Sequence, residues 1–231
     1  KQGCYGIDVS QYQKNIDWKK VKASGVDYAI IRATKYSSSG EGGTNLVKDS
    51  RFDENMKNAI AAGVKVGVYV YSYANTKSEA IKEAELVIKY VKPYKLTYPI
   101  YYDIEEGSRQ KTSLKKENTS FCIAFCDKVV KAGYRAGVYT GASFFNSYLN
   151  VDDLRNYDLW VARYIYSSVY ALHTNRKVVD AYVDKTYMYN TSNGLKNRFT
   201  NLNADMWQFT SNGQVDGISG RIDMNFSYIC Y

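Results

Sequence analysis

A short pattern in which a helix ends at a glycine and a strand follows at once occurs three times along the chain. The three copies contain Gly25, Gly63 and Gly133. A glycine can adopt the left-handed conformation that ends a helix, and a β-rich run follows each of these three within a few residues. Repeated helix–glycine–strand units are typical of β/α folds with a largely parallel sheet.

These units and the later part of the chain predict eight strands. They cover Tyr5–Ser10, Tyr28–Ala33, Val66–Tyr73, Tyr98–Glu105, Ala136–Tyr139, Leu159–Tyr164, Asp205–Phe209 and Arg221–Phe226. Helices are predicted over Trp18–Ser24, Glu54–Ala62, Glu79–Lys92 and about 118–132. Eight strands with helices between them indicate a (β/α) barrel, and 231 residues suffice for one. We therefore expect residues 1–231 to form a single barrel domain.

The second half of the chain departs from the ideal barrel pattern. Between Tyr164 and Asp205 the sequence is polar and rich in Tyr, with weak helical periodicity. Only Thr210 to Gly220 separate the last two predicted strands, which is short for a helical crossover and favours a β-hairpin. We expect an irregular TIM-like α/β barrel that is helical in its first half, with its last strands partly antiparallel.

Strand alternation places acidic residues of three strands on the inner face of this barrel. Asp103 and Glu105 are two residues apart in the fourth predicted strand, and their apolar neighbours share the other face. Asp8 in the first strand and Asp223 in the eighth oppose apolar neighbours in the same way. Acids late in these strands converge on the C-terminal rim, where the active sites of such barrels are built.

Four crowded carboxyls suit a reaction that needs both a proton donor and an anion. A structural ion pair or cap is the alternative for any single acid, but burying several unpaired charges would cost several kcal/mol. Crowding splits the pKa values, so that one group keeps a proton while others stay charged. Cleavage of a glycosidic bond uses this combination, because an acid protonates the leaving oxygen while an anion stabilises positive charge. Asp103 and Glu105 are therefore the candidate catalytic pair.

Aromatic side chains are predicted to bind substrate at the same end of the barrel. The chain contains 24 Tyr, 8 Phe and 3 Trp. Tyrosine combines a flat apolar face with a hydroxyl, and sugars require both in a binding groove. Filling of the barrel core is the alternative for any one ring. The candidates face inward or lie near strand ends, and they are Tyr69, Tyr71, Tyr139, Tyr164 and Trp207.

Charge and composition narrow the range of partners. The net charge of +8 favours anionic partners such as nucleic acid, membrane surfaces or acidic wall polymers. Basic residues are scattered and no nucleic-acid motif is present, so nucleic-acid binding is not expected. No apolar run approaches the roughly 20 residues that cross a membrane. The single histidine, His173, leaves no cluster for a metal site.

The four cysteines and the first residues bear on covalent structure and location. Cys4 and Cys230 lie beside the first and last predicted strands, so a disulfide between them is one option. Cys122 and Cys126 are one helical turn apart and fit buried thiols. The start of the chain, without Met or an apolar signal core, is interpreted as a processed or excised terminus.

The ordered set of motifs resembles the family 25 glycoside hydrolases, the lysozymes (muramidases) of bacteria and their phages. The resemblance spans essentially the whole chain. The matching pieces are G-I-D-V-S at 6–10, Ile31-Arg32-Ala33-Thr34, Ala62-Gly63 with Val66-Gly67-Val68-Tyr69, Asp103-Ile104-Glu105, Ala132-Gly133 with Gly137-Val138-Tyr139, Trp207-Gln208-Phe209-Thr210-Ser211, and Gly217-Ile218, Gly220 and Ile222-Asp223-Met224-Asn225.

This resemblance implies hydrolysis of the β-1,4 bond between N-acetylmuramic acid and N-acetylglucosamine in bacterial cell-wall peptidoglycan, without a cofactor. Matched by motif, Glu105 would be the general acid/base. Asp103 would orient the N-acetyl group of the substrate, the internal nucleophile proposed for this family. Asp8 and Asp223 would shape the charge of the site and hold water or substrate. The implied place of action is the cell wall, reached by secretion or by phage delivery.

Two places depart from the family pattern. Ala33-Thr34-Lys35-Tyr36, followed by a Ser/Gly-rich loop to Thr44, stands where the family often has Ala-Thr-Glu-Gly, and we expect this loop to line the cleft. Val70 follows Tyr69 where many members have His. Two other functions stay open on the residues alone: a barrel that binds peptidoglycan or chitin-like glycans without cutting them, and a glycosidase that acts on another N-acetylated glycan.

Overall fold

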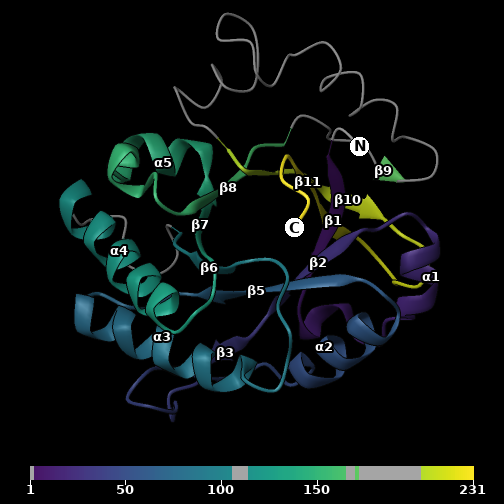
Figure 1. The fold of residues 1–231 in the computed structure, drawn as a ribbon, viewed down its shortest axis with the longest axis horizontal. Helices are drawn as coiled ribbons and strands as arrows, with labels where there is room; N and C mark the ends of the chain where they lie inside the picture. The colour runs from purple at the N-terminus through teal and green to yellow at the C-terminus, as the bar shows by residue number, and fades with distance from the viewer. Residues whose placement is uncertain (1–2, 106–113, 165–169, 172–203) are drawn as a thin grey trace, which may run out of the picture.

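Eight strands close into a barrel in the computed structural model of this chain (Figure 1). The structure describes residues 3–105, 114–164, 170–171 and 204–231. In spatial order the barrel strands are β1 (Cys4–Val9), β2 (Tyr28–Arg32), β5 (Lys65–Tyr71), β6 (Ile100–Asp103), β7 (Ala136–Gly141), β8 (Asp158–Ala162), β10 (Met206–Gln214) and β11 (Ile222–Ser227). All eight predicted strands are confirmed, with ends that shift by a few residues.

The strand directions confirm an irregular barrel with an antiparallel closure. The pairs from β1 through β8 to β10 are parallel. β11 pairs antiparallel with both β10 and β1, and this closes the barrel. The β10–β11 connection is too short for a helix, so β11 returns beside β10 in the opposite direction.

Five described helices accompany the strands: α1 (Trp18–Ala23), α2 (Phe52–Ala61), α3 (Lys77–Val91), α4 (Lys115–Lys131) and α5 (Ala142–Tyr148). The first four were predicted. Gly25, Gly63 and Gly133 follow α1, α2 and α4 with φ values of 95°, 78° and 92°, so each adopts the left-handed conformation expected of it. Helix α5 was not predicted, because its seven residues are too few to establish a helical period.

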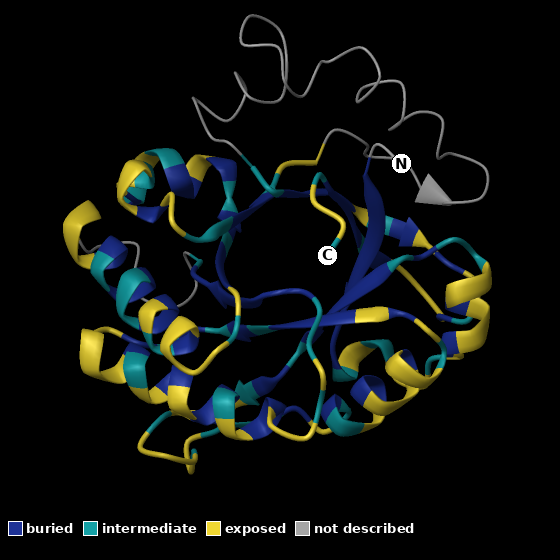
Figure 2. Ribbon diagram, in the orientation of Figure 1, coloured by how far each residue is buried: buried dark blue, intermediate teal, exposed yellow. Residues whose placement is uncertain are grey.

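Two apolar clusters divide the molecule into an outer and an inner core. The outer core lies between strands and helices and includes Val66, Val68 and Val70 of β5. Figure 2 shows the same division, with buried strands and exposed residues on the outer helix surfaces. The inner cluster fills the barrel near the strand beginnings, where the rings of Tyr28 and Tyr98 stack 4.2 Å apart. Polar side chains can therefore line the C-terminal end of the barrel.

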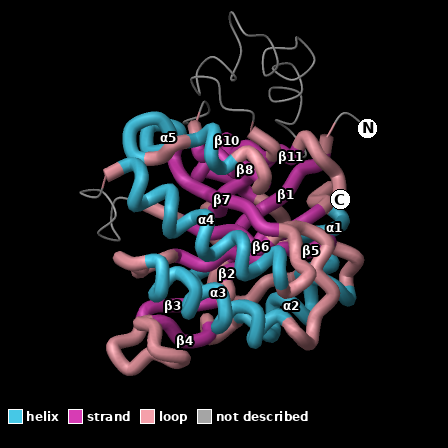
Figure 3. Tube along the Cα trace, turned by 60° about the vertical axis from the view of Figure 1, so that its left-hand side comes forward, coloured by secondary structure: helices cyan, strands magenta, loops and turns pink. Residues whose placement is uncertain are grey.

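The expected Ser/Gly-rich loop is present, and it joins the two strands of a short hairpin outside the barrel. Strands β3 (Thr34–Tyr36) and β4 (Leu46–Lys48) pair antiparallel directly after β2. Three residues per strand are too few to show alternation in the sequence, which explains why only a loop was expected. In Figure 3 the hairpin lies beside α3. A further two-residue strand, β9 (Tyr170–Ala171), pairs with the end of β10. His173 lies outside the described residues.

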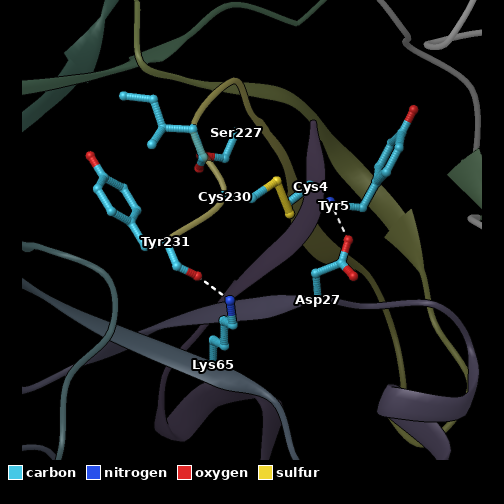
Figure 4. The surroundings of a disulfide bond; sticks show 8 residues. Cys4, Tyr5, Asp27, Lys65, Ser227, Cys230 and Tyr231 are labelled. Carbon is cyan, nitrogen blue, oxygen red and sulfur yellow. Dashed lines mark hydrogen bonds between the residues drawn. A yellow bond between two sulfur atoms is a disulfide. The ribbon is translucent and has the colours of Figure 1, made fainter. Parts of the chain in front are cut away.

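A disulfide between Cys4 and Cys230 joins the start of β1 to the tail that follows the neighbouring strand β11 (Figure 4). Their Cα atoms are 5.7 Å apart, and Cys4 also pairs with Ser227 of β11. Cys122 and Cys126 are buried free thiols on α4. None of the described helices is long and apolar enough to cross a membrane.

Candidate active site

Four acids that lie on or just after three strands meet at one end of the barrel, where β1 and β6 end. Asp8 lies directly opposite Asp223 in the β1–β11 pairing. Asp103 ends β6, opposite Tyr71 on one neighbouring strand and Tyr139 on the other. The negative charge of Glu105, two residues beyond Asp103, raises the pKa values of Asp103, Asp8 and Asp223. Alternation along the strands thus brings the predicted acids together.

Asp103 and Glu105 form a hydrogen-bonded carboxyl pair. Burial raises the pKa of Asp103 well above its usual range, and the charge of Glu105 and their mutual hydrogen bond raise it further. Two carboxyl groups can share a hydrogen bond only when one of them carries a proton. The side chain of Asp103 is 3% exposed, and its Oδ1 atom has no hydrogen-bond partner among the described residues. The pair therefore holds one proton, and Asp103 Oδ1 beside it is a buried acceptor without a described hydrogen-bond partner.

The carboxyls of Asp8 and Asp223 also form a hydrogen-bonded pair that shares a proton. Burial raises the pKa of Asp223, and the charge of Asp8 and their hydrogen bond raise it further. Burial also raises the pKa of Asp8, whereas hydrogen bonds from Asn225, Gln208 and Asp223 lower it. On balance burial raises the pKa of Asp8, and the hydrogen bond between the two carboxyls favours the proton on Asp223 and the negative charge on Asp8.

An amide network holds Asp8 in place, and sequence reasoning missed its members. The side-chain amides of Gln208 and Asn225 both donate to Asp8 Oδ2, at 2.9 and 2.8 Å. Asn225 in turn accepts a 2.8 Å hydrogen bond from the indole of Trp160. Every amide group here is buried. Charge-assisted donors of this kind favour an ionised carboxylate, so the network fixes the position of Asp8 and opposes the rise of its pKa on burial.

One basic side chain also reaches the site. Arg32 ends β2, and its guanidinium lies 5.9 Å from the centre of the Tyr71 ring. Its positive charge lowers the pKa of Asp103, although burial and Glu105 outweigh it. Arg32 belongs to the motif Ile31-Arg32-Ala33-Thr34, but the motif alone predicts no role for it. Arg32 lies at the end of a predicted strand, and this position could have indicated a role in the site.

The five predicted substrate-binding aromatics fall into different environments. Tyr139 and Tyr164 both donate to Gln208 Oε1, at 2.7 and 3.0 Å. Tyr69 lies deeper in the barrel, with its ring 6.2 Å from that of Trp160. Tyr71 and the half-exposed Tyr164 are nearer the surface.

Trp207 is the exception among these five aromatic residues. It is fully buried in the outer core, where its indole donates to the Arg163 carbonyl at 2.8 Å. Alternation along β10 places Gln208, not Trp207, on the inner face. The structure therefore does not bring Trp207 to the acids.

A buried glutamate holds the backbone next to the strand end that carries Asp103. Glu83 of α3 is 2% exposed, and Ser72 Oγ lies 2.7 Å from both Glu83 Oε2 and the Tyr102 hydroxyl. The Tyr73 backbone N–H donates to Glu83 Oε1 at 2.8 Å. Ser72 N–H also donates to the Asp103 carbonyl at 2.9 Å. Glu83 therefore fixes the chain just after β5, next to the end of β6 that carries Asp103.

We predict that Glu83 makes stability depend on pH near neutrality. Burial raises its pKa from 4.5 to about 7, so the folded protein retains a proton that the unfolded chain loses. The contribution of Glu83 to the free energy of unfolding is fully present at low pH and is lost as pH rises from about 4.5 to about 7. Glu83→Gln stays neutral, so its free energy of unfolding should rise by about 3 kcal/mol relative to that of the wild type across this interval. Urea unfolding of both proteins from acid to mildly alkaline pH measures the difference, and a constant gap would contradict the prediction.

Comparison with known proteins identifies the family. The model of "Glycosyl hydrolases family 25" matches residues 7–218, which include the barrel strands from β1 to β10 in whole or in part. The chain belongs to this family. Family 25 membership agrees with the predicted resemblance and with the mixed barrel. It also places the acid-lined end of the barrel in a family whose members hydrolyse glycosidic bonds.

Several family 25 relatives are similar over most of this chain. The autolytic lysozyme of Clostridium acetobutylicum is 27% identical over 95% of the chain and 54% of its own length. The lysozyme of Lactococcus phage mv1 is 29% identical over 69% of the chain and 78% of its own length. The solved structure of the modular autolysin LytC from Streptococcus pneumoniae superposes with a TM-score of 0.72 at 26% identity, and covers 97% of this chain and 46% of that one. The chain thus spans about half the length of two of these proteins.

The two departures from the family 25 pattern have different structural consequences. Val70 is fully buried in the outer core, so the residue that stands in place of the frequent His faces away from the acids. The segment after Thr34 instead forms the β3–β4 hairpin at the C-terminal end of β2. Only the second departure lies on the side of the barrel that carries the site.

Proposed function

We propose that this family 25 chain is a lysozyme that hydrolyses the β-1,4 bond between N-acetylmuramic acid and N-acetylglucosamine in bacterial peptidoglycan. One observation carries the proposal: the buried carboxyl of Asp103 is hydrogen-bonded to the carboxyl of Glu105 at the end of the barrel. A carboxyl that can donate a proton, next to another that can bear charge, is the minimum that glycosidic cleavage requires.

Glu105 acts as general acid and base in this mechanism. The proton that Asp103 and Glu105 share passes to Glu105, which donates it to the glycosidic oxygen as the bond from that oxygen to the anomeric carbon breaks, and Asp103 is left as the anion. The N-acetyl carbonyl oxygen of the same sugar attacks the anomeric carbon, and Asp103 orients the amide and stabilises its positive charge. Glu105 then takes a proton from the attacking water, which opens the intermediate and leaves a reducing sugar.

The remaining acids and the aromatic residues complete the proposed site. Anionic Asp8 adds negative potential where positive charge develops, and Asp223 holds substrate or water through its proton. The candidates for sugar contacts are Tyr69, Tyr71, Tyr139 and Tyr164. Because strands from both ends of the chain close the barrel, we infer one catalytic domain over residues 1–231.

Relatives support peptidoglycan as the substrate. LytC, which resembles this chain with a TM-score of 0.70 at 25% identity in this form, has been solved in complex with a synthetic peptidoglycan ligand. The names of the clostridial and phage relatives are autolytic lysozyme and lysozyme. The positive charge of +8 also favours attraction to anionic wall polymers, and the proposed place of action is the cell wall outside the membrane.

Digestion of two purified polymers tests the proposal. The protein should release fragments from peptidoglycan whose new reducing ends are N-acetylmuramic acid, as determined by mass spectrometry. It should release far less from chitin, which lacks this sugar. Release of N-acetylglucosamine reducing ends, or preferential cleavage of chitin, would assign a different glycosidase specificity. Wall binding without any release would favour the alternative, a glycan-binding barrel that does not cut.

A further inference from the structure

A series of tyrosine rings leads away from the catalytic acids toward the solvent. Tyr71 ends β5 opposite Asp103. Its ring lies 5.2 Å from that of Tyr73, and the Tyr73 ring lies 5.0 Å from that of Tyr36 on β3. We call Tyr71, Tyr73 and Tyr36 the tyrosine shelf. The shelf is continuous with the proposed catalytic centre and ends at a side chain that is 53% exposed.

Electrostatic interactions place the shelf at the acid-lined end of the barrel. Burial raises the pKa of Tyr73, and the nearby groups that also affect it include Arg32, Tyr36 and Asp103. Tyr73 therefore lies among groups from β2, β3 and β6. Arg32 also lies beside Tyr71, at the inner end of the shelf.

The hairpin that carries Tyr36 is held against the barrel. Tyr36 pairs with Leu46, which is fully buried, and Ser37 N–H donates to the Asn45 carbonyl at 2.9 Å. The hairpin turn and the start of α3 enclose a small cavity of about 60 Å³, whose lining includes Thr44, Asn45, Tyr73 and Glu83. Glu83 fixes the backbone of Tyr73 on the other side of this contact. Tyr36 is thus presented from a packed element.

The exposed ring of Tyr36 keeps apolar surface in contact with water, and a ligand that covers the ring would remove this surface from water. Large apolar side chains are stabilised by burial, at about 25 cal/mol for each Å² removed from water. A sugar ring offers a C–H face to an aromatic ring and hydroxyls to its phenolic group. A glycan strand that is cut at the acids must continue on both sides of the cleaved bond. The shelf therefore lies where such a strand can continue.

From this geometry we infer that Tyr36 and Tyr73 form a sugar subsite remote from the cleaved bond, which makes the enzyme prefer long glycan strands over short ones. The inference rests on the proposed function and adds to it a determinant of substrate length. Tyr36 is the specificity-determining residue, because the hairpin that carries it replaces the frequent family motif. Tyr73 supports it by ring contact.

Steady-state kinetics on soluble peptidoglycan glycans of two lengths test this inference. Tyr36→Ala should raise KM for an octasaccharide about five- to tenfold, as expected for one lost ring contact, with kcat nearly unchanged. For a tetrasaccharide bound across the acids, KM should stay within about twofold of the wild-type value. Tyr36→Phe is the matched control, since it keeps the ring and should retain most of the preference. Equal KM values for wild type and Tyr36→Ala on the octasaccharide would overturn the inference.

Separate readouts distinguish a failed subsite from a failed function. If the wild type cuts both glycans and Tyr36→Ala has no length-dependent effect, the subsite is wrong and the lysozyme proposal stands. If the wild type cuts neither glycan, the proposed function fails. Calorimetric titration with the octasaccharide then tests the shelf alone, and equal affinity of the wild type and Tyr36→Ala would reject it. Thermal unfolding of each variant confirms that the exposed substitution leaves the fold intact.

Discussion

Glu105→Gln is expected to lower kcat on peptidoglycan by about 10²–10⁴, the range contributed by general acid–base catalysis. Gln is close to Glu in size and can still accept a hydrogen bond from Asp103, but it cannot donate a proton to the glycosidic oxygen. The proton of the Asp103–Glu105 pair then has no route to the leaving group. Wall binding should persist, because the aromatic contacts are unchanged. Rates of release of reducing ends, together with binding to insoluble wall, measure both effects.

A surface glutamate provides the matched control for this substitution. Glu117 lies in the first turn of α4, is exposed and lies outside the site, so Glu117→Gln should keep the wild-type rate. Asp103→Asn should also lower kcat, since the amide can neither share a proton with Glu105 nor stabilise positive charge. If Glu105→Gln retained most of the activity, Glu105 would not be the general acid, and the proton donor would have to be sought among the other acids.

The inner faces of the strands could be predicted because alternation is a local property. Asp8, Asp103 and Asp223 each lie between apolar neighbours, and the structure places all three on the inner face, as expected. The partners of these acids were not predictable in the same way. Gln208 contacts Asp8 across 200 positions of sequence, and only closure of the barrel brings them together.

Trp207 shows how residue type can mislead where strand geometry is sufficient. An aromatic residue near a strand end predicts a sugar contact, although its neighbour Gln208 occupies the inner face. The same alternation that located the acids would have selected the glutamine. The β3–β4 hairpin is a different case, because three-residue strands carry no period, and its position depends on packing against α3 and β5. Neither the hairpin nor the shelf could be predicted from local pattern.

Removal of the Cys4–Cys230 disulfide is expected to lower the free energy of unfolding by about 3–5 kcal/mol. The bond joins residues 226 apart in sequence, and a cross-link over so long a loop strongly restricts the unfolded chain. It also anchors the last residues, since the Tyr231 ring lies 5.1 Å from that of Tyr98 and beneath Arg135 at 4.6 Å. Figure 4 shows this tail beside the start of β1.

The double variant Cys4→Ser with Cys230→Ser tests this contribution by urea unfolding. Cys4 lies about 13 Å along β1 from Asp8, at the end of the barrel away from the acids, so kcat should be unchanged where both proteins are folded. A reducing agent should lower the unfolding midpoint of the wild type toward that of the variant and leave the variant unaffected. That control separates loss of the cross-link from damage by the two serines. An unfolding midpoint equal to the wild type would mean that antiparallel β1–β11 pairing alone closes the barrel.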